Sequence, residues 1–345
     1  MMAQLEAARN CADYRAEVTM LLTLAQAEQA VGNIPSAASR LQVALTIARE
    51  HHLDSEEAVV LADLGTLDYL QGRPNEARLH LSESAQRGGH TEITAGNLGL
   101  VLHDLGRLEE ARMSLEQAIE ICRSLGLRTK EASNLSHLGE VCRGLGDVEA
   151  AENLLGSSVE IARSEAAPHT ESESLIKLAV LWTGLPDRLE DAAEHAEAAL
   201  AFASSTRSRS TEAHAHLVLG VVSRCLGRSS EAIGHDQEAW NIARSTGYLR
   251  VEAGTRVGIA RSYLQLGDLE TARRHLVEGL DAAKGRGFRL IESDALVVLS
   301  EIERRRGRGD IATALCCIAL DIQRKAKYRL GAREAAGLLR TLVGD

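Results

Sequence analysis

The stretch Ser136-His-Leu-Gly-Glu-Val-Cys-Arg-Gly-Leu-Gly-Asp-Val-Glu-Ala-Ala151 decides the fold of this chain. It predicts the end of one helix, a turn at Gly146 and the start of a second helix, because glycine ends a helix in the left-handed conformation at little cost. The same phrase recurs along the chain, at intervals of 40, 34, 40, 41, 40, 40 and 40 residues. The turn positions are Gly32, Gly72, Gly106, Gly146, Asp187, Gly227, Gly267 and Gly307. A repeat of this length is typical of a solenoid of stacked helices.

A small residue marks the same point of every repeat. An alanine follows each turn position by five residues, which predicts a close approach of two helices. These alanines are Ala37, Ala77, Ala111, Ala151, Ala192, Ala232, Ala272 and Ala312. A leucine or isoleucine followed by a small residue precedes each turn, as in Leu138-Gly139. The pattern predicts an all-α fold of about eight helix pairs.

The repeats divide the chain into three parts. Residues 1–12 match the end of a second helix and predict an incomplete preceding repeat, residues 13–328 hold eight repeats, and residues 329–345 predict a C-terminal capping helix. Because the array begins in mid-repeat, we expect the natural polypeptide to continue upstream. The second repeat is shorter, with Gly88-Gly89 in place of helix, and the fifth carries Pro186 and one extra residue in its turn.

Charges recur at the helix ends. A glutamate opens the first helix of most repeats and a base closes the second, as Glu131 and Arg123 do. Each sign complements the helix dipole at its end, so the pattern predicts capping and surface pairing between neighbouring helices.

Composition and motifs limit the function. The net charge of −10 disfavours nucleic acid as a partner, because phosphate binding needs a basic surface. No apolar run reaches the ~20 residues that span a bilayer, and the N-terminus lacks the features of a signal peptide, so we expect a cytoplasmic protein without a membrane partner. The six cysteines show no metal spacing, and no catalytic set or phosphate loop is present, so we expect no cofactor and no enzymatic activity. A helical-repeat enzyme is the alternative from another class.

With its Leu-Gly pairs, turn glycines and regular alanines, the chain resembles a tetratricopeptide repeat array over about residues 13–328. Its 40-residue period is similar to that of kinesin light chains, of adaptors with Leu-Gly-Asn repeats, and of the sensor arms of bacterial signal-transduction ATPases and antibiotic-pathway regulators. Arginine outnumbers lysine, which is typical of GC-rich bacterial genomes and favours the last group. The resemblance implies a right-handed superhelix whose first helices line a concave groove for a peptide or protein.

From this resemblance we expect a non-enzymatic scaffold that serves as the sensor or interaction arm of a bacterial cytoplasmic regulator of transcription. An ATPase or DNA-binding domain upstream in the same polypeptide would receive the signal. A free-standing adaptor is the alternative.

The resemblance also places the groove at three positions of each first helix: one before the leucine, two after it and five after it. The position before the leucine is polar in repeats one to five and is not in repeats six to eight. The candidate binding stripe consists of Asp63, Asn97, His103, His137, Glu140, Arg143 and Lys177. These side chains form either a binding stripe or merely solvated helix faces, and Asn97, His137 and Lys177 are expected to be exposed.

The apolar groove residues of repeats six to eight either pack a partner helix or are buried in a tightly wound superhelix; they are Val218, Val221, Val257, Val297 and Val298.

Overall fold

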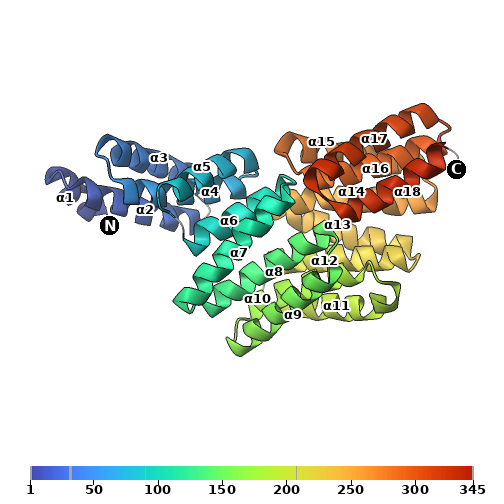
Figure 1. Cartoon of the computed structure of the whole chain (residues 1–345), viewed down its shortest axis with the longest axis horizontal. Coiled ribbons are helices and arrows are strands. Elements are labelled where there is room, and N and C mark those ends of the chain that lie inside the picture. The colour runs from blue at the N-terminus through green and yellow to red at the C-terminus, as the bar shows by residue number, and fades with distance from the viewer. Residues whose placement is uncertain (1, 31–32, 90, 207, 344–345) are drawn as a thin grey trace. The chain divides into compact units, whose positions relative to one another are not determined.

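The computed structural model describes residues 2–30, 33–89, 91–206 and 208–343, and the chain folds into helices throughout these ranges (Figure 1). The order of helices α2 to α17 matches the eight predicted helix pairs, and the single helix α18 follows them. The predicted all-α solenoid is therefore confirmed. The turn position Gly32 lies outside the described residues.

The chain divides into two compact units, residues 1–102 and 103–345. Unit 1 holds five helices, and a sixth runs across its end. They are α1 (Met2–Asn10), α2 (Tyr14–Ala30), α3 (Ile34–Glu50), α4 (Asp54–Leu70), α5 (Pro74–Gln86) and α6 (Glu92–Asp104). From α1 to α5 each helix packs against its neighbour in sequence, and Leu41, Leu61 and Leu67 form part of a continuous core. Helix α5 is short, as predicted, because the chain leaves the helix before Gly88, which takes a φ of +87°.

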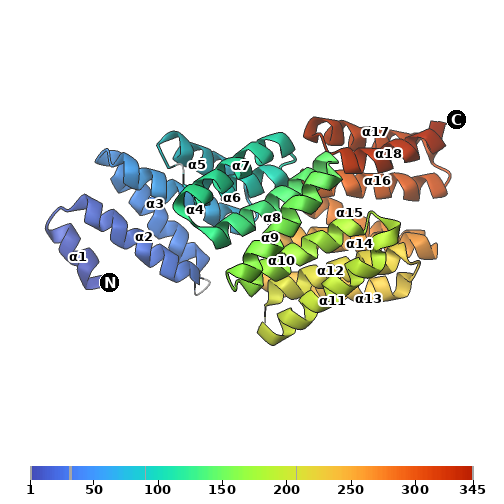
Figure 2. The same cartoon turned by 60° about the horizontal axis from the view of Figure 1, so that its bottom comes forward.

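Unit 2 repeats the same arrangement of antiparallel pairs, and Figure 2 shows α11, α12 and α13 lying side by side. A short 3-10 turn, η1 (Pro186–Arg188), makes the turn of the fifth repeat. The helices are α7 (Leu108–Leu125), α8 (Arg128–Leu145), α9 (Val148–Ser164), α10 (Pro168–Trp182), α11 (Leu189–Thr206), α12 (Arg209–Cys225), α13 (Ser229–Thr246), α14 (Leu249–Leu266), α15 (Leu269–Arg286), α16 (Arg289–Arg305), α17 (Gly309–Ala326) and α18 (Arg329–Val343).

The repeated small residues lie where the two helices of a pair meet. All eight alanines five residues after the turn positions are 0% exposed, from Ala37 to Ala312. In repeat four, a Cβ added at Gly139 would lie 2.7 Å from Cγ of Leu155 on the partner helix. The small residues therefore let a leucine of the second helix pack against the backbone of the first helix.

The turns follow the prediction with one exception. Gly146 takes a φ of +84°, and five of the other turn glycines also take positive values; they are Gly72, Gly106, Gly227, Gly267 and Gly307. Asp187 does not, because it lies inside the 3-10 turn that accommodates the extra residue.

The charges at the helix ends pair between neighbouring helices, as expected. Arg123 Nε lies 2.7 Å from Glu131 Oε1, and the same pairing joins Arg9 to Glu17, Arg49 to Glu57 and Arg163 to Glu171. The expected surface location is wrong for the carboxylates of Glu57 and Glu131, whose side chains are only 3% exposed. Each of these two carboxylates also pairs with a second arginine, Arg87 for Glu57 and Arg128 for Glu131, and the two arginines together cover the carboxylate.

Helix α18 is more than a solvated end of the array. It packs against α17 and α16, and it also contacts α8, far earlier in the chain. A Cβ at Gly146 would lie 3.1 Å from Cβ of Arg329, so the fourth turn and the start of α18 touch. The helices of unit 2 thus wind far enough for the last helix to reach the fourth repeat.

Candidate functional site

Two members of the predicted stripe belong to unit 1, where they bond to the preceding repeat. Nε2 of Gln26 donates to Oδ2 of Asp63 over 3.0 Å, and Nδ2 of Asn97 donates to Oγ1 of Thr66 over 2.8 Å. Both Asp63 and Asn97 are half-buried, and burial raises the pKa of Asp63. The expectation of an exposed Asn97 is therefore wrong, because its amide bonds to the neighbouring first helix.

The other five predicted residues belong to unit 2 and come from three successive first helices. His103 at the end of α6 is buried, while His137, Glu140 and Arg143 of α8 and Lys177 of α10 are half-buried. The expected exposure of His137 and Lys177 is wrong. The reason is the winding of unit 2, which brings side chains of α12 and α14 into the same interior.

The structure gathers these five residues with four others into one group, which we call the central polar cluster. Its members are His103, Asp104, His137, Glu140, Arg143, Glu173, Lys177, His214 and Arg250. They come from α6, α8, α10, α12 and α14, so five repeats contribute to one interior surface.

Arg250 joins three of these helices. Its Nε lies 2.7 Å from Oδ1 of Asp104, and its Nη2 lies 3.2 Å from Oε1 of Glu140. The Asp104 side chain is 3% exposed, whereas that of Arg250 is 37% exposed. Ion pairs of this kind need good geometry to offset the loss of hydration, and one arginine between two carboxylates provides it.

Lys177 and His137 form the second contact of the cluster. Nζ of Lys177 lies 2.7 Å from Nδ1 of His137. Burial, together with the positive charge of Lys177, lowers the pKa of His137 to about 3. The imidazole is therefore neutral near pH 7, and its Nδ1 accepts a hydrogen bond from the ammonium.

Two carboxyl groups keep their charge in this interior. Burial alone would raise the pKa of Glu140, but Arg250, His103, Lys177 and Arg143 together hold it well below its ordinary range. Burial alone would also raise the pKa of Glu173, but Lys177 and His137 together lower it below its ordinary value. The cluster is thus a set of fixed charges of both signs.

Two charged members of the cluster lack a hydrogen-bonding partner among the described residues. The guanidinium of Arg143 and the carboxylate of Glu173 form no hydrogen bond or ion pair with any side chain in the described part of the chain. Both residues are half-buried, so each keeps some exposed surface. They are therefore free to bind a ligand group of opposite charge or a peptide amide.

Four members of the cluster were not predicted from the sequence; they are Asp104, Glu173, His214 and Arg250. Glu173 lies four residues before Lys177 on one helix, and this spacing is a signal that identifies it as a neighbour. Asp104 follows His103 directly. His214 and Arg250 lie near the starts of their helices, away from the three groove positions, and only the winding of unit 2 brings them in.

The apolar groove residues of repeats six to eight are mainly core. Val218, Val257, Val297 and Val298 are between 1% and 6% exposed, which agrees with burial inside the superhelix. Val221 is half-buried and lines a pocket. Among the described residues, no group of His, Cys, Asp or Glu is arranged to hold a metal ion, and no helix is long and apolar enough to cross a membrane.

Comparison with known families gives two matches, both to models described as tetratricopeptide repeat, over residues 90–164 and 253–278. No curated protein sequence matches the chain. Two similar solved structures share its fold over nearly their whole length. A Rap protein complexed with competence and sporulation factor has a TM-score of 0.63 at 15% identity and covers 95% of this chain and 98% of its own. The apo form of RapI has a TM-score of 0.63 at 14% identity and covers 78% of this chain and 98% of its own.

A third solved structure is a signal-transduction ATPase (STAND) protein with a tetratricopeptide repeat sensor from Pyrococcus horikoshii. Its TM-score is 0.50 at 16% identity, and the match covers 96% of this chain and 49% of that protein. At these identities the likeness is one of fold alone.

Proposed function

Because this chain is built of tetratricopeptide repeats, we propose that it is a non-enzymatic scaffold that binds a protein or peptide segment against the central polar cluster of unit 2. Repeats of this family are typically non-catalytic and act in protein interaction. The observation that carries the proposal is that Arg143 and Glu173 form no hydrogen bond or ion pair with a described side chain, whereas Arg250 of the same cluster pairs with Asp104 and Glu140.

The arrangement suits an extended peptide. Neither charge has a hydrogen-bonding partner among the described side chains, so a ligand that supplies the opposite charge or an amide adds a hydrogen bond there. Arg143 on α8 offers several donors in a planar fork, and Glu173 on α10 offers acceptors one repeat further along. A peptide that lies across both helices would meet a cation and then an anion.

The experiment is a selection of peptides from a random library on the purified chain, followed by fluorescence anisotropy with a selected peptide. We expect Arg143→Gln and Glu173→Gln each to weaken binding at least tenfold with unchanged helicity. Arg304→Gln is the matched control, because Arg304 occupies the same groove position in repeat eight but is already bonded to Glu301. Equal binding by all three variants would show that the peptide binds elsewhere.

We also propose that the scaffold is the sensor or interaction arm of a bacterial cytoplasmic regulator of transcription, in which ligand binding changes the winding of the repeats and an upstream ATPase or DNA-binding domain responds. The fold shared with the sensor of the Pyrococcus ATPase supports this proposal. The alternative is a free-standing adaptor. The mass of the native polypeptide in its source cell separates the two, because a regulator is much larger than the 37.1 kDa of this chain.

A further inference from the structure

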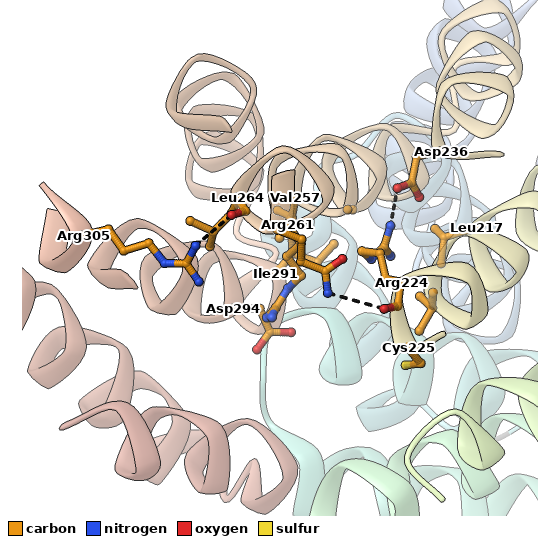
Figure 3. Close-up of a pocket in the computed structure, with 14 residues that line it drawn as sticks. Leu217, Arg224, Cys225, Asp236, Val257, Arg261, Leu264, Ile291, Asp294 and Arg305 are labelled. Atoms are coloured by element: carbon orange, nitrogen blue, oxygen red, sulfur yellow. Dashed lines mark hydrogen bonds and ion pairs between the residues drawn. The ribbon is translucent and has the colours of Figure 1, made fainter. Parts of the chain in front are cut away.

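A pocket of about 470 Å³ lies between the first helices of repeats six, seven and eight, α12, α14 and α16 (Figure 3). Its lining combines aliphatic side chains, Val221, Val257 and Ile291 among them, with charged and polar groups. Sites for small ligands have volumes of about 300–1,000 Å³, apolar walls and a few placed polar groups. The size and lining of this pocket therefore fit a ligand, and its polar groups define which one.

Asp236 occupies a position that is leucine in most other repeats. The equivalent residues are Leu41, Leu81, Leu115, Leu155 and Leu276. Asp236 is 0% exposed, and a Cβ at Gly220 or Gly258 would lie 2.6 Å or 2.8 Å from its Oδ1, so the two glycines make room for the carboxyl group. Its Oδ2 accepts a hydrogen bond from Nη1 of Arg224, as Figure 3 shows.

Arg224 is held in place on one side and open on the other. Its side chain is 9% exposed, and its Nη1 bonds to Asp236 and, at 3.4 Å, to Oγ of Ser262. Its Nε and Nη2 donate to no atom of the described residues. Neither nitrogen is among the fully buried polar atoms that lack a hydrogen-bond partner, so both have some exposed surface. Arg224 also lines the pocket.

The remaining charged groups of the pocket are already engaged. Arg261 pairs with Glu334, and Arg305 pairs with Glu301 and donates to the carbonyl oxygen of Leu264. Asp294 lies near Arg261, and burial raises its pKa to about 7. Burial likewise raises the pKa of Asp236 to about 7, although Arg224 acts in the opposite direction.

We propose that the pocket between α12, α14 and α16 binds a carboxylate carried on an aliphatic body, with the open Nε–Nη2 edge of Arg224 as its receptor. The guanidinium edge presents two parallel N–H groups to the two oxygens of a carboxylate. The aliphatic side chains of the lining then take the hydrocarbon part. The carboxylate belongs either to a small organic acid or to a peptide, and this site is separate from the peptide surface proposed above.

The exposed thiol of Cys225 lines the same pocket and provides a local readout. We would measure the rate at which a maleimide labels Cys225 in the full chain, with 4-methylpentanoate, N-acetylleucine or their uncharged amides as probes. Both acids present the proposed chemistry, and the second presents it as a peptide C-terminus does. The exposed Cys11 and Cys317 are internal controls that no probe should protect.

We expect at least one acid to slow labelling of Cys225 at a concentration at least tenfold lower than its amide requires. Protection by 4-methylpentanoate alone assigns the site to small acids, and protection by N-acetylleucine alone assigns it to peptides. Protection by neither acid, or equal protection by acid and amide, overturns the proposal.

The matched variant is Arg224→Met combined with Asp236→Leu, which restores the leucine of the other repeats. Replacing a buried ion pair by apolar residues is often neutral or stabilising, whereas Arg224→Met alone would leave a buried carboxyl group without its partner. The double variant should unfold at the same urea concentration as the wild type or higher, and it should lose the difference between acid and amide. An unchanged difference in a folded double variant would exclude Arg224 as the receptor.

Discussion

A pair of glycine substitutions in repeat four tests the helix packing quantitatively. Gly139 of α8 and Gly156 of α9 both lie inside helices, so alanine at either should gain about 1 kcal/mol of helix propensity. At Gly156 an added Cβ meets nothing within 4 Å, whereas at Gly139 it lies 2.7 Å from Cγ of Leu155 and 3.3 Å from the carbonyl oxygen of Ala151.

The two sites should therefore respond differently. Gly156→Ala should raise the free energy of unfolding by about 1 kcal/mol. At Gly139 the overpacking cost of about 1–3 kcal/mol outweighs the same gain, so the variant should range from unchanged to about 2 kcal/mol less stable. The difference between the two variants is then about 1–3 kcal/mol, and the contact with Leu155 is its cause.

Urea unfolding followed by far-ultraviolet circular dichroism measures this difference. The slope of free energy against urea must agree between the variants, because repeat proteins can unfold in parts. In the Gly139→Ala background, Leu155→Val should cost less than in the wild type, since it relieves the clash and the two changes are coupled. A Gly139→Ala variant as stable as Gly156→Ala would show that α8 and α9 do not meet as described.

Three further predictions concern charges and thiols. Glu131→Gln should lower the free energy of unfolding by about 1–3 kcal/mol, because the side chain of Glu131 is 3% exposed and pairs with two arginines. Glu171→Gln should lower it by at most about 1 kcal/mol, because Glu171 is 27% exposed and pairs with one arginine. Equal losses of the two variants in urea unfolding would contradict this prediction. The depressed pKa of His137, about 3 against 6.5, contributes stability that is complete above pH 6.5 and is lost as the pH falls from 6.5 towards 3. The His137→Gln variant should therefore lose less stability than the wild type between pH 6.5 and 5, and parallel curves would show that His137 is exposed. In the folded chain a thiol reagent should label Cys11, Cys225 and Cys317, and it should reach Cys122, Cys142 and Cys316 only after unfolding.

The features predicted well from the sequence are those set within one repeat. The close approach at Ala151 and the turn at Gly146 depend on residues a few positions apart, and eight copies of the same pattern reinforce the prediction. A final helix was also expected within residues 329–345, and α18 spans Arg329–Val343. Local geometry suffices for these features, because each repeat contacts mainly its neighbours.

The candidate site was predicted only in part, because it depends on the winding of many repeats. Arg250 reaches Asp104 and Glu140 only through the summed rotations of the helices between them, and no local pattern gives that sum. The buried pair of Arg224 and Asp236 is different, since a charged residue at a leucine position is visible when the repeats are aligned with one another. Such an alignment identifies Asp236 as an unusual residue by its sequence position alone.

The contact of α18 with α8 changes how unit 2 responds to the loss of its last helix. A linear stack can lose a terminal helix and keep the rest, because each repeat depends on its two neighbours alone. In unit 2 the end of the chain also supports the middle: Arg329 meets the turn at Gly146, and Tyr328 lies beside Gly144. The two distant segments must be brought together during folding at an entropic cost, so this closure slows assembly. It also couples distant helices, so that a change at the C-terminus is transmitted to the fourth repeat without passing through each helix in turn.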